Sequence, residues 1–312
     1  MQKPYICVVG GANVDVHCIS YTKLQTQNSN PGRVSLSCGG VARNISENLA
    51  RLGQKVYLIT VLGNDSGAKM IEQNAACAGI DLSHSLRVDE ANSMYVSVND
   101  VDCDMFVGVA SMDVLQRLTP QFLQSKLELL NGAACVVADT NIPESLAFLQ
   151  KNVQSPLFVD AVSAKKAVRC KDSLQKIYCL KPNTFEAQAL CGVEIKDASS
   201  AGRACEKLAQ RGIDVIYLSC GIDGVYCYSN GNFRHVPSCA EKVLNTTGAG
   251  DSFMAGVVYG FVNGMGVEES AVWGSAAAAE TISSAETVSK NMNIETLTKR
   301  IENVTKERHG SV

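Results

Sequence analysis

The sequence predicts an α/β protein with a mainly parallel central sheet and a small β-sheet lid. Short apolar runs such as Tyr5–Val9 and Val215–Ser219 are typical of strands that are buried on both faces. Stretches with apolar residues at helical spacing follow many of these runs, so strands and helices alternate as in βαβ units. Four other segments, at 14–18, 34–38, 94–98 and 105–109, alternate apolar and polar residues. That pattern indicates strands with one solvated face, in a separate sheet.

Composition excludes several classes of function. The 312 residues include 28 Lys and Arg against 31 Asp and Glu, a net charge of −3 with no long run of either sign. We therefore expect a small-molecule partner, with no nucleic acid and no membrane surface. The apolar run near the first residue is too short for a signal-peptide core and no stretch is long enough to span a bilayer, which predicts a cytoplasmic protein. The odd number of cysteines, 13, without a C-x-x-C pair predicts reduced core thiols, and the scattered histidines predict no zinc site.

The first third of the chain predicts elements of both sheets. Gly10 and Gly11 end the first strand, but the G-x-G-x-x-G spacing of a dinucleotide-binding fold is absent. Asn13 and Asp15 follow that strand at the end of the sheet where α/β proteins bind ligands. A helix opens at Gly39-Gly40, and a strand at 56–62 and a helix at 68–78 come next. We expect the alternating segments to form a lid, from about 13–38 and 92–110, that closes the site against water.

The rest of the chain continues the alternation, with polar residues after each of three strands. Those residues are Asp139 to Asn141, Asp160 and Ser163 with Lys165 and Lys166 beyond, and Lys181 to Glu186. The expected helices are 118–130, 144–152, 201–211, 252 onward, 270–284 and a tail from 294, and the expected strands are 134–138, 156–160, 177–180, 215–219 and 225–228. Neither a repeat nor a linker divides the chain, so we expect a single domain spanning residues 1–312.

The stretch from Asn245 to Asp251 has the pattern of an active site. Gly248, Ala249 and Gly250 precede an apolar helical pattern, so they lie at a helix N-terminus, where free N–H groups and the helix dipole bind anions such as phosphate. Asp251, on the first turn, could take the proton from a hydroxyl that attacks phosphorus. This is kinase chemistry. The alternative is a glycine turn followed by an Asp that merely favours the helix dipole.

Four motifs in order resemble the ribokinase-like (PfkB) family of carbohydrate and nucleoside kinases over nearly the whole chain. They are Gly39-Gly40 with Asn44, the N-x-x-E of Asn183 and Glu186, Gly221-x-x-Gly224, and the final G-A-G-D. Each is weak alone, and their combination is specific. The resemblance implies the ribokinase-like three-layer sandwich, with ATP and Mg²⁺ as cofactors.

The resemblance also implies a role for each motif. Asp251 would be the general base on a ribose 5′-hydroxyl, and the backbone of Gly248, Ala249 and Gly250 would be the anion hole. The ribose hydroxyls would be bound by Asn13, Asp15, Gly39, Gly40 and Asn44. ATP would be bound by Asn183, Ser219, Gly221, Gly224, Gly248 and Gly250. Glu186 would hold Mg²⁺ through water. The group on C1 of the ribose would meet Asn141, Ser93 and Lys166.

Within the family, five segments look most like the members that phosphorylate pseudouridine: 13–15, 30–32, 39–44, 139–142 and 162–166. The alternatives are ribokinase or another sugar or nucleoside kinase of the family, and a catalytically idle ligand-binding relative, against which the presence of Asp251 argues. Asn245 stands where many members have an Asp that helps to hold K⁺, so activation by K⁺ is left open. Related kinases often pair through the lid, which allows a homodimer.

Overall fold

The central sheet has nine strands and is mainly parallel. The computed structural model describes residues 4–102, 104–175, 177–241 and 243–309. Within them the strand order is β15-β14-β13-β12-β11-β10-β1-β4-β6, and only β13, β14 and β15 pair in antiparallel fashion. Its strands are β1 Tyr5–Val9, β4 Lys55–Ile59, β6 Ile80–Asp81, β10 Cys135–Asp139, β11 Leu157–Asp160, β12 Cys179–Lys181, β13 Val215–Ser219, β14 Val225–Ser229 and β15 Asn232–Val236. The predicted sheet is therefore confirmed.

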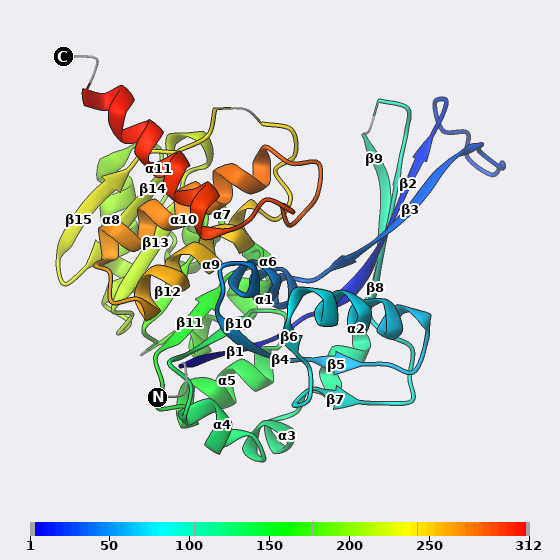
Figure 1. The fold of residues 1–312 in the computed structure, drawn as a ribbon, viewed down its shortest axis with the longest axis horizontal. Coiled ribbons are helices and arrows are strands. Elements are labelled where there is room, and N and C mark those ends of the chain that lie inside the picture. Colours follow the sequence, from blue (N-terminus) through cyan, green and yellow to red (C-terminus); the bar gives the residue numbers. More distant parts are fainter. Residues whose placement is uncertain (1–3, 103, 176, 242, 310–312) are drawn as a thin grey trace.

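Helices cover both faces of this sheet, as Figure 1 shows. One layer contains α3 Pro120–Gln124, α4 Leu127–Asn131, α5 Pro143–Asn152, α6 Ala164–Arg169, α7 Thr184–Cys191 and α8 Ala198–Ala209, and the other contains α1 Val41–Arg51, α2 Ser66–Ala78, α9 Ala249–Val262 and α10 Val267–Ile282. Alternate residues of β1 enter the two cores: Cys7 and Val9 face one layer, and Ile6 and Val8 face the other. The continuous apolar run thus reflects burial on both faces, and the three-layer arrangement is confirmed.

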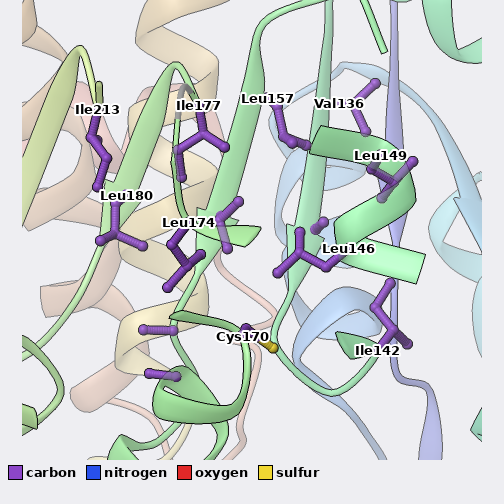
Figure 2. Packing of buried hydrophobic residues seen from close by; sticks show 14 of the residues in the cluster. Val136, Ile142, Leu146, Leu149, Leu157, Cys170, Leu174, Ile177, Leu180 and Ile213 are labelled. Carbon is purple, nitrogen blue, oxygen red and sulfur yellow. The ribbon is translucent and has the colours of Figure 1, made fainter. Parts of the chain in front are cut away.

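The two cores are closely packed side chains from sheet and helices. Figure 2 shows part of the first, where Leu146 and Leu149 of α5 lie beside Val136 of β10, all fully buried. The last helix, α11 Ile294–His309, packs outside α10 through the buried Leu297. Short 3₁₀ turns complete the described elements at Asp113–Arg117, Lys171–Ser173 and Gly221–Asp223.

The four alternating segments form a separate sheet in the order β3-β2-β8-β9, which we call the small sheet. Its strands are β2 Asn13–Ser20, β3 Gly32–Gly39, β8 Met94–Asn99 and β9 Met105–Ser111. β2 and β8 are parallel, and the two outer pairs are antiparallel. The small sheet projects from the body of the molecule beside α1 and α2 (Figure 1). The register places Val16 opposite both Leu36 and Val96, so apolar side chains share one face.

Several predicted boundaries were wrong. The expected strand 56–62 is two strands, because the chain leaves the central sheet at Thr60, whose backbone N–H binds the Ser85 hydroxyl. The second piece, β5 Val61–Leu62, pairs with β7 Leu86–Arg87. The short helices α6 and α7 and the edge strand β15 were not predicted, since none is long enough to show a clear period.

None of the helices among the described residues combines the length and the apolar character that a membrane crossing needs. Cys7, Cys135 and Cys179 are buried free thiols of β1, β10 and β12, as expected of core cysteines. Cys103 lies outside the described residues.

Candidate active site

The carboxyl edge of the central sheet gathers three charged side chains in one row. Asp139, Asp160 and Lys181 are the last residues of β10, β11 and β12, and they are paired across the sheet in register. The Lys181 ammonium lies 2.7 Å from Oδ2 of Asp160, and both side chains are buried. Parallel strands in register point paired side chains to the same face, so the sheet itself aligns these charges.

Asp139 fastens the loops that follow two neighbouring strands. Its Oδ2 accepts a hydrogen bond from the backbone N–H of Gly11, and its Oδ1 accepts one from Asn141, each at 2.9 Å. Burial raises the pKa of Asp139, and these two hydrogen bonds oppose that rise. Asp139 therefore holds these two loops in position and does not itself face a ligand.

Asp251 is held at the N-terminus of α9 by a contact from a distant helix. Nδ2 of Asn44, on α1, donates a 2.7 Å hydrogen bond to Oδ2 of Asp251 in a buried setting. Burial, together with the charge of Asp160, raises the pKa of Asp251 to about 7, while the Asn44 hydrogen bond and Lys181 act in the opposite direction. A carboxyl with a pKa close to neutral pH is suited to general base catalysis. The sequence predicted both residues, and the structure brings them together.

Gly248 is the N-cap residue of α9. It caps the helix in the left-handed region, at φ +83°, and a Cβ there would overlap the carbonyl oxygen of Thr287. The helix begins at Ala249 rather than at Ser252, so the N–H groups of Ala249, Gly250 and Asp251 belong to its first turn, where they have no carbonyl partner within the helix. The predicted anion site thus has the required backbone geometry.

The predicted ribose-binding residues surround the junction between the small sheet and α1. Nδ2 of Asn13 donates to Oδ1 of Asp15 at 2.6 Å, and burial raises the pKa of Asp15. A Cβ on Gly39 would overlap the Asp15 carboxylate, and Gly40 adopts φ +100° against the backbone of Gly11. Both positions therefore require glycine. Oδ1 of Asn44 is buried and has no hydrogen-bond partner among the described residues, as expected of an atom that serves a ligand.

A cavity of about 140 Å³ lies beside the first turn of α9. Six of the residues that line it are Lys181, Ser219, Gly221, Gly224, Ala249 and Gly250. Gly221 and Gly224 both have positive φ, at +61° and +96°. Ser219 ends β13 and its hydroxyl lies 3.4 Å from the carbonyl oxygen of Pro182. The predicted nucleotide-binding residues of this region thus share one cavity with the N-terminus of α9.

Asn183 and Glu186 form a capping box at the start of α7. Both carboxylate oxygens of Glu186 accept hydrogen bonds from Asn183, at 2.8 and 2.9 Å, and the Asn183 side chain accepts one from the backbone of Glu186. Burial raises the pKa of Glu186, and Asn183 opposes that rise. No group of three or more acidic, histidine or cysteine side chains that could hold a metal occurs in the described part of the chain.

The remaining predicted residues lie around the loops after β10 and β11. The Lys166 ammonium donates to Oδ1 of Asn141 at 2.6 Å. Ser93 is buried at the base of β8, and its hydroxyl has no hydrogen-bond partner among the described residues. Oδ1 of Asn245 accepts from the backbone N–H of Thr247, so this side chain shapes the loop before α9.

Sequence reasoning placed Lys181 among the polar residues that follow the third strand, but assigned it no role in the site. The predicted strand ended at Leu180, one residue early, and so the lysine was not recognised as the last in-register residue of β12. Its position directly after an apolar run and before Pro182-Asn183 was the available signal.

Comparison with known proteins agrees with this geometry. The sequence profile described as “pfkB family carbohydrate kinase” matches residues 3–294, so the chain belongs to that family and is an ATP-dependent kinase. It is 34% identical to the pseudouridine kinase of Escherichia coli over 97% of this chain and 98% of that one. It is 26% identical to the ribokinase of Haemophilus influenzae, covering 89% and 92% of the two chains. The crystal structure of a protein assigned as a sugar kinase from Clostridium perfringens superimposes with a TM-score of 0.88, at 31% identity and 97% coverage of each chain.

The raised pKa of Asp251 predicts a pH-dependent stability. The ordinary pKa of such a carboxyl is 3.8, so between about pH 4 and 7 the folded protein alone keeps this proton. The contribution of Asp251 to stability is therefore lost as the pH rises through that window, by up to about 1.4 kcal/mol per pH unit. The side chain of Asp251→Asn cannot ionise. The free energy of unfolding of this variant should therefore rise relative to that of the wild type as the pH increases from 4 to 7.

Denaturant titrations at a series of pH values measure this difference. Asp197→Asn is a suitable control, because the hydrogen bonds of Ser200 lower the pKa of Asp197. The contribution of Asp197 to stability therefore increases with pH, and does so at a lower pH than the loss at Asp251. A difference between Asp251→Asn and wild type that stays constant from pH 4 to 7 would contradict the assigned pKa.

Proposed function

We propose that this kinase transfers a phosphoryl group from ATP to the 5′-hydroxyl of a ribosyl compound, and that pseudouridine is its substrate. The observation that carries the proposal is the buried hydrogen bond between Asn44 and Asp251. It holds a carboxylate with a pKa of about 7 against the amide of Asn44, and the same helix turn lines the cavity at the N-terminus of α9 through Ala249 and Gly250. Such a carboxylate can remove the proton from an attacking hydroxyl.

Each residue then has a defined part in the transfer. Asp251 accepts the proton of the 5′-hydroxyl as its oxygen bonds to the terminal phosphorus and the bond to the leaving ADP breaks. Asn44 orients the carboxylate, and the backbone N–H groups of the first turn of α9, at Gly250 and Asp251, stabilise the negative charge of the transferring group. Asn13, Asp15 and Asn44 bind the ribose hydroxyls and fix the distance between the two reacting atoms.

The small sheet is proposed to act as a lid over the ribose. Asn13 and Asp15 lie on β2, next to Gly39 at the end of β3, so the sheet carries part of the substrate site on its own strands. The polar residues Asp15, Ser37 and Tyr95 occupy neighbouring positions on one face. Closing this face over the ribose excludes water, which would otherwise compete as the phosphoryl acceptor.

The choice of pseudouridine is supported by the relative from Escherichia coli and by the pair formed by Lys166 and Asn141. A uracil attached through carbon presents an N–H group at an edge where uridine has none. An amide oxygen such as that of Asn141 can accept a hydrogen bond from it, while Lys166 donates to a ring carbonyl. The buried and unpartnered hydroxyl of Ser93 is a further candidate contact. Ribokinase activity is the second candidate, favoured by the ribose-binding groups alone.

Mg²⁺ would be held near Glu186. A carboxylate has about four lone-pair sites, and Asn183 occupies two of those on Glu186, so the remainder can bind the water of a hydrated ion. When bound, Mg²⁺ neutralises the charge of the nucleotide phosphates.

A homodimer through the small sheet is also proposed. The face opposite the polar one carries the exposed apolar side chains Val34, Leu36, Met105, Val107 and Val109. Soluble monomers rarely expose a contiguous apolar patch of this kind, and a two-fold dimer would cover the same patch on both copies. The strand β9 is exposed along its whole length, which leaves room for a second copy.

The proposed substrate predicts a kinetic ranking. The value of kcat/KM, measured with Mg²⁺ and ATP, should be higher for pseudouridine than for uridine, ribose or adenosine, because a site built on hydrogen bonds rejects analogues that lack the partner. Lys166→Met should lower the ratio of kcat/KM for pseudouridine to kcat/KM for ribose by roughly 10–100-fold. Lys165→Met, an exposed neighbour, is the control. A higher value for ribose or adenosine would refute the pseudouridine proposal and leave the kinase assignment standing.

The proposed metal role predicts a change in metal dependence. Glu186→Gln should raise the Mg²⁺ concentration that gives half-maximal activity by about 10–100-fold, since outer-shell partners contribute that much to metal affinity. The matched control is Glu194→Gln, at an exposed position near the end of α7. If the titration curve of Glu186→Gln coincides with that of the wild type, Glu186 has no such role.

The proposed dimer predicts a change in mass. Sedimentation velocity should give a dimer for the wild type and a monomer for Leu36→Glu, because the introduced charge would be buried in the interface. Val101→Glu, in the turn between β8 and β9, should remain dimeric. A wild-type monomer at micromolar concentration would rule the interface out.

A further inference from the structure

Lys181 is a buried ammonium between the acidic residues of the sheet edge and the glycines of α9. It is 6% exposed, and Nζ lies 2.7 Å from Oδ2 of Asp160. The same nitrogen lies 2.7 Å from the position that a Cβ on Gly250 would occupy. The lysine thus reaches from β12 to the first turn of α9, and it fills the space beside Gly250.

The hydrogen-bonding capacity of Lys181 is only partly used. An ammonium group has three donors, and within the described chain Asp160 is the one side chain that forms an ion pair with it. Lys181 also lines the cavity that contains Ser219, Gly221 and Gly250. A buried charge with spare donors is costly unless something accepts them, so the cavity is suited to an anion.

Lys181 is charged at neutral pH. Burial lowers its pKa, but the neighbouring carboxylates outweigh burial, with Asp160 first and then Asp251 and Glu186, and the net pKa is raised. The residue therefore brings a permanent positive charge to the place where the nucleotide cavity meets the proposed base.

We propose that Lys181 is a catalytic residue that donates hydrogen bonds to the phosphoryl group during its transfer. The proposal rests on the proposed function, since it assigns the inner end of the cavity to the terminal phosphate. The charge on the three outer oxygens of that group is stabilised by a fixed cation more than by neutral amides alone. No bond to Lys181 forms or breaks, and it keeps all its protons throughout the step.

The competing explanation is that Lys181 only neutralises Asp160. Lys181→Met alone cannot separate the two, because it leaves the buried Asp160 unpaired and threatens folding. The double variant Lys181→Met with Asp160→Asn removes both charges, so a merely structural partner is no longer needed. Lys207→Met, on the exposed side of α8, is the control for the substitution itself.

Calorimetric binding provides a readout that does not depend on turnover. The probes are a non-hydrolysable ATP analogue and AMP, each with Mg²⁺. The double variant should bind the analogue roughly 10–100-fold more weakly than the wild type and bind AMP within about two-fold, because only the analogue has a terminal phosphate to lose a charged partner. Its kcat should fall about 10²–10³-fold.

The opposite outcomes have different meanings. A double variant that binds the analogue and turns over like the wild type would overturn the role of Lys181 while leaving the proposed function intact. A wild-type protein that binds the analogue no better than AMP would overturn the placement of the terminal phosphate, and both proposals with it.

Discussion

The hydrogen bond from Asn44 to Asp251 is the contact on which the site depends. It joins α1, which follows β3, to α9, whose N-terminus is the proposed anion site, across 207 positions of sequence. Because Asp251 is buried near Asp160, its charged form is disfavoured, and the amide of Asn44 limits that penalty. The result is a carboxyl that titrates close to neutral pH. The same hydrogen bond links the proposed ribose-binding residues to the helix whose first turn lines the proposed nucleotide cavity.

The pairing of the parallel strands positions the other charged side chains near Asp251. Three neighbouring strands end in register at Asp139, Asp160 and Lys181, so the charges beneath Asp251 are placed by backbone pairing and not by flexible loops. Glycines then leave space for charged side chains at the proposed ligand-binding backbone. Gly39 makes room for the carboxylate of Asp15, and Gly250 makes room for the ammonium of Lys181. A larger side chain at either glycine would displace a charged group from the site.

Much of this arrangement was predictable from sequence, for identifiable reasons. The strands of the central sheet are continuous apolar runs and those of the small sheet alternate, so the two sheets could be distinguished from their periods. Asp251, Asn44 and the glycines were recognised from motifs. The break at Thr60 was missed because both halves are apolar, and the capping box of Asn183 and Glu186 was not recognised as the start of α7. The ion pair of Lys181 and Asp160 depends on strand order, which periodicity does not reveal.

The central claim is that Asp251 removes the proton from the attacking hydroxyl. The most direct test is the single-turnover rate of Asp251→Asn at saturating Mg²⁺, ATP and pseudouridine, compared with the wild type. The asparagine keeps the shape and the contact with Asn44 but cannot accept a proton, so the rate should fall by ~10²–10⁴-fold while nucleotide binding is retained. A rate within a few-fold of the wild type, in a variant of unchanged fold, would contradict the account.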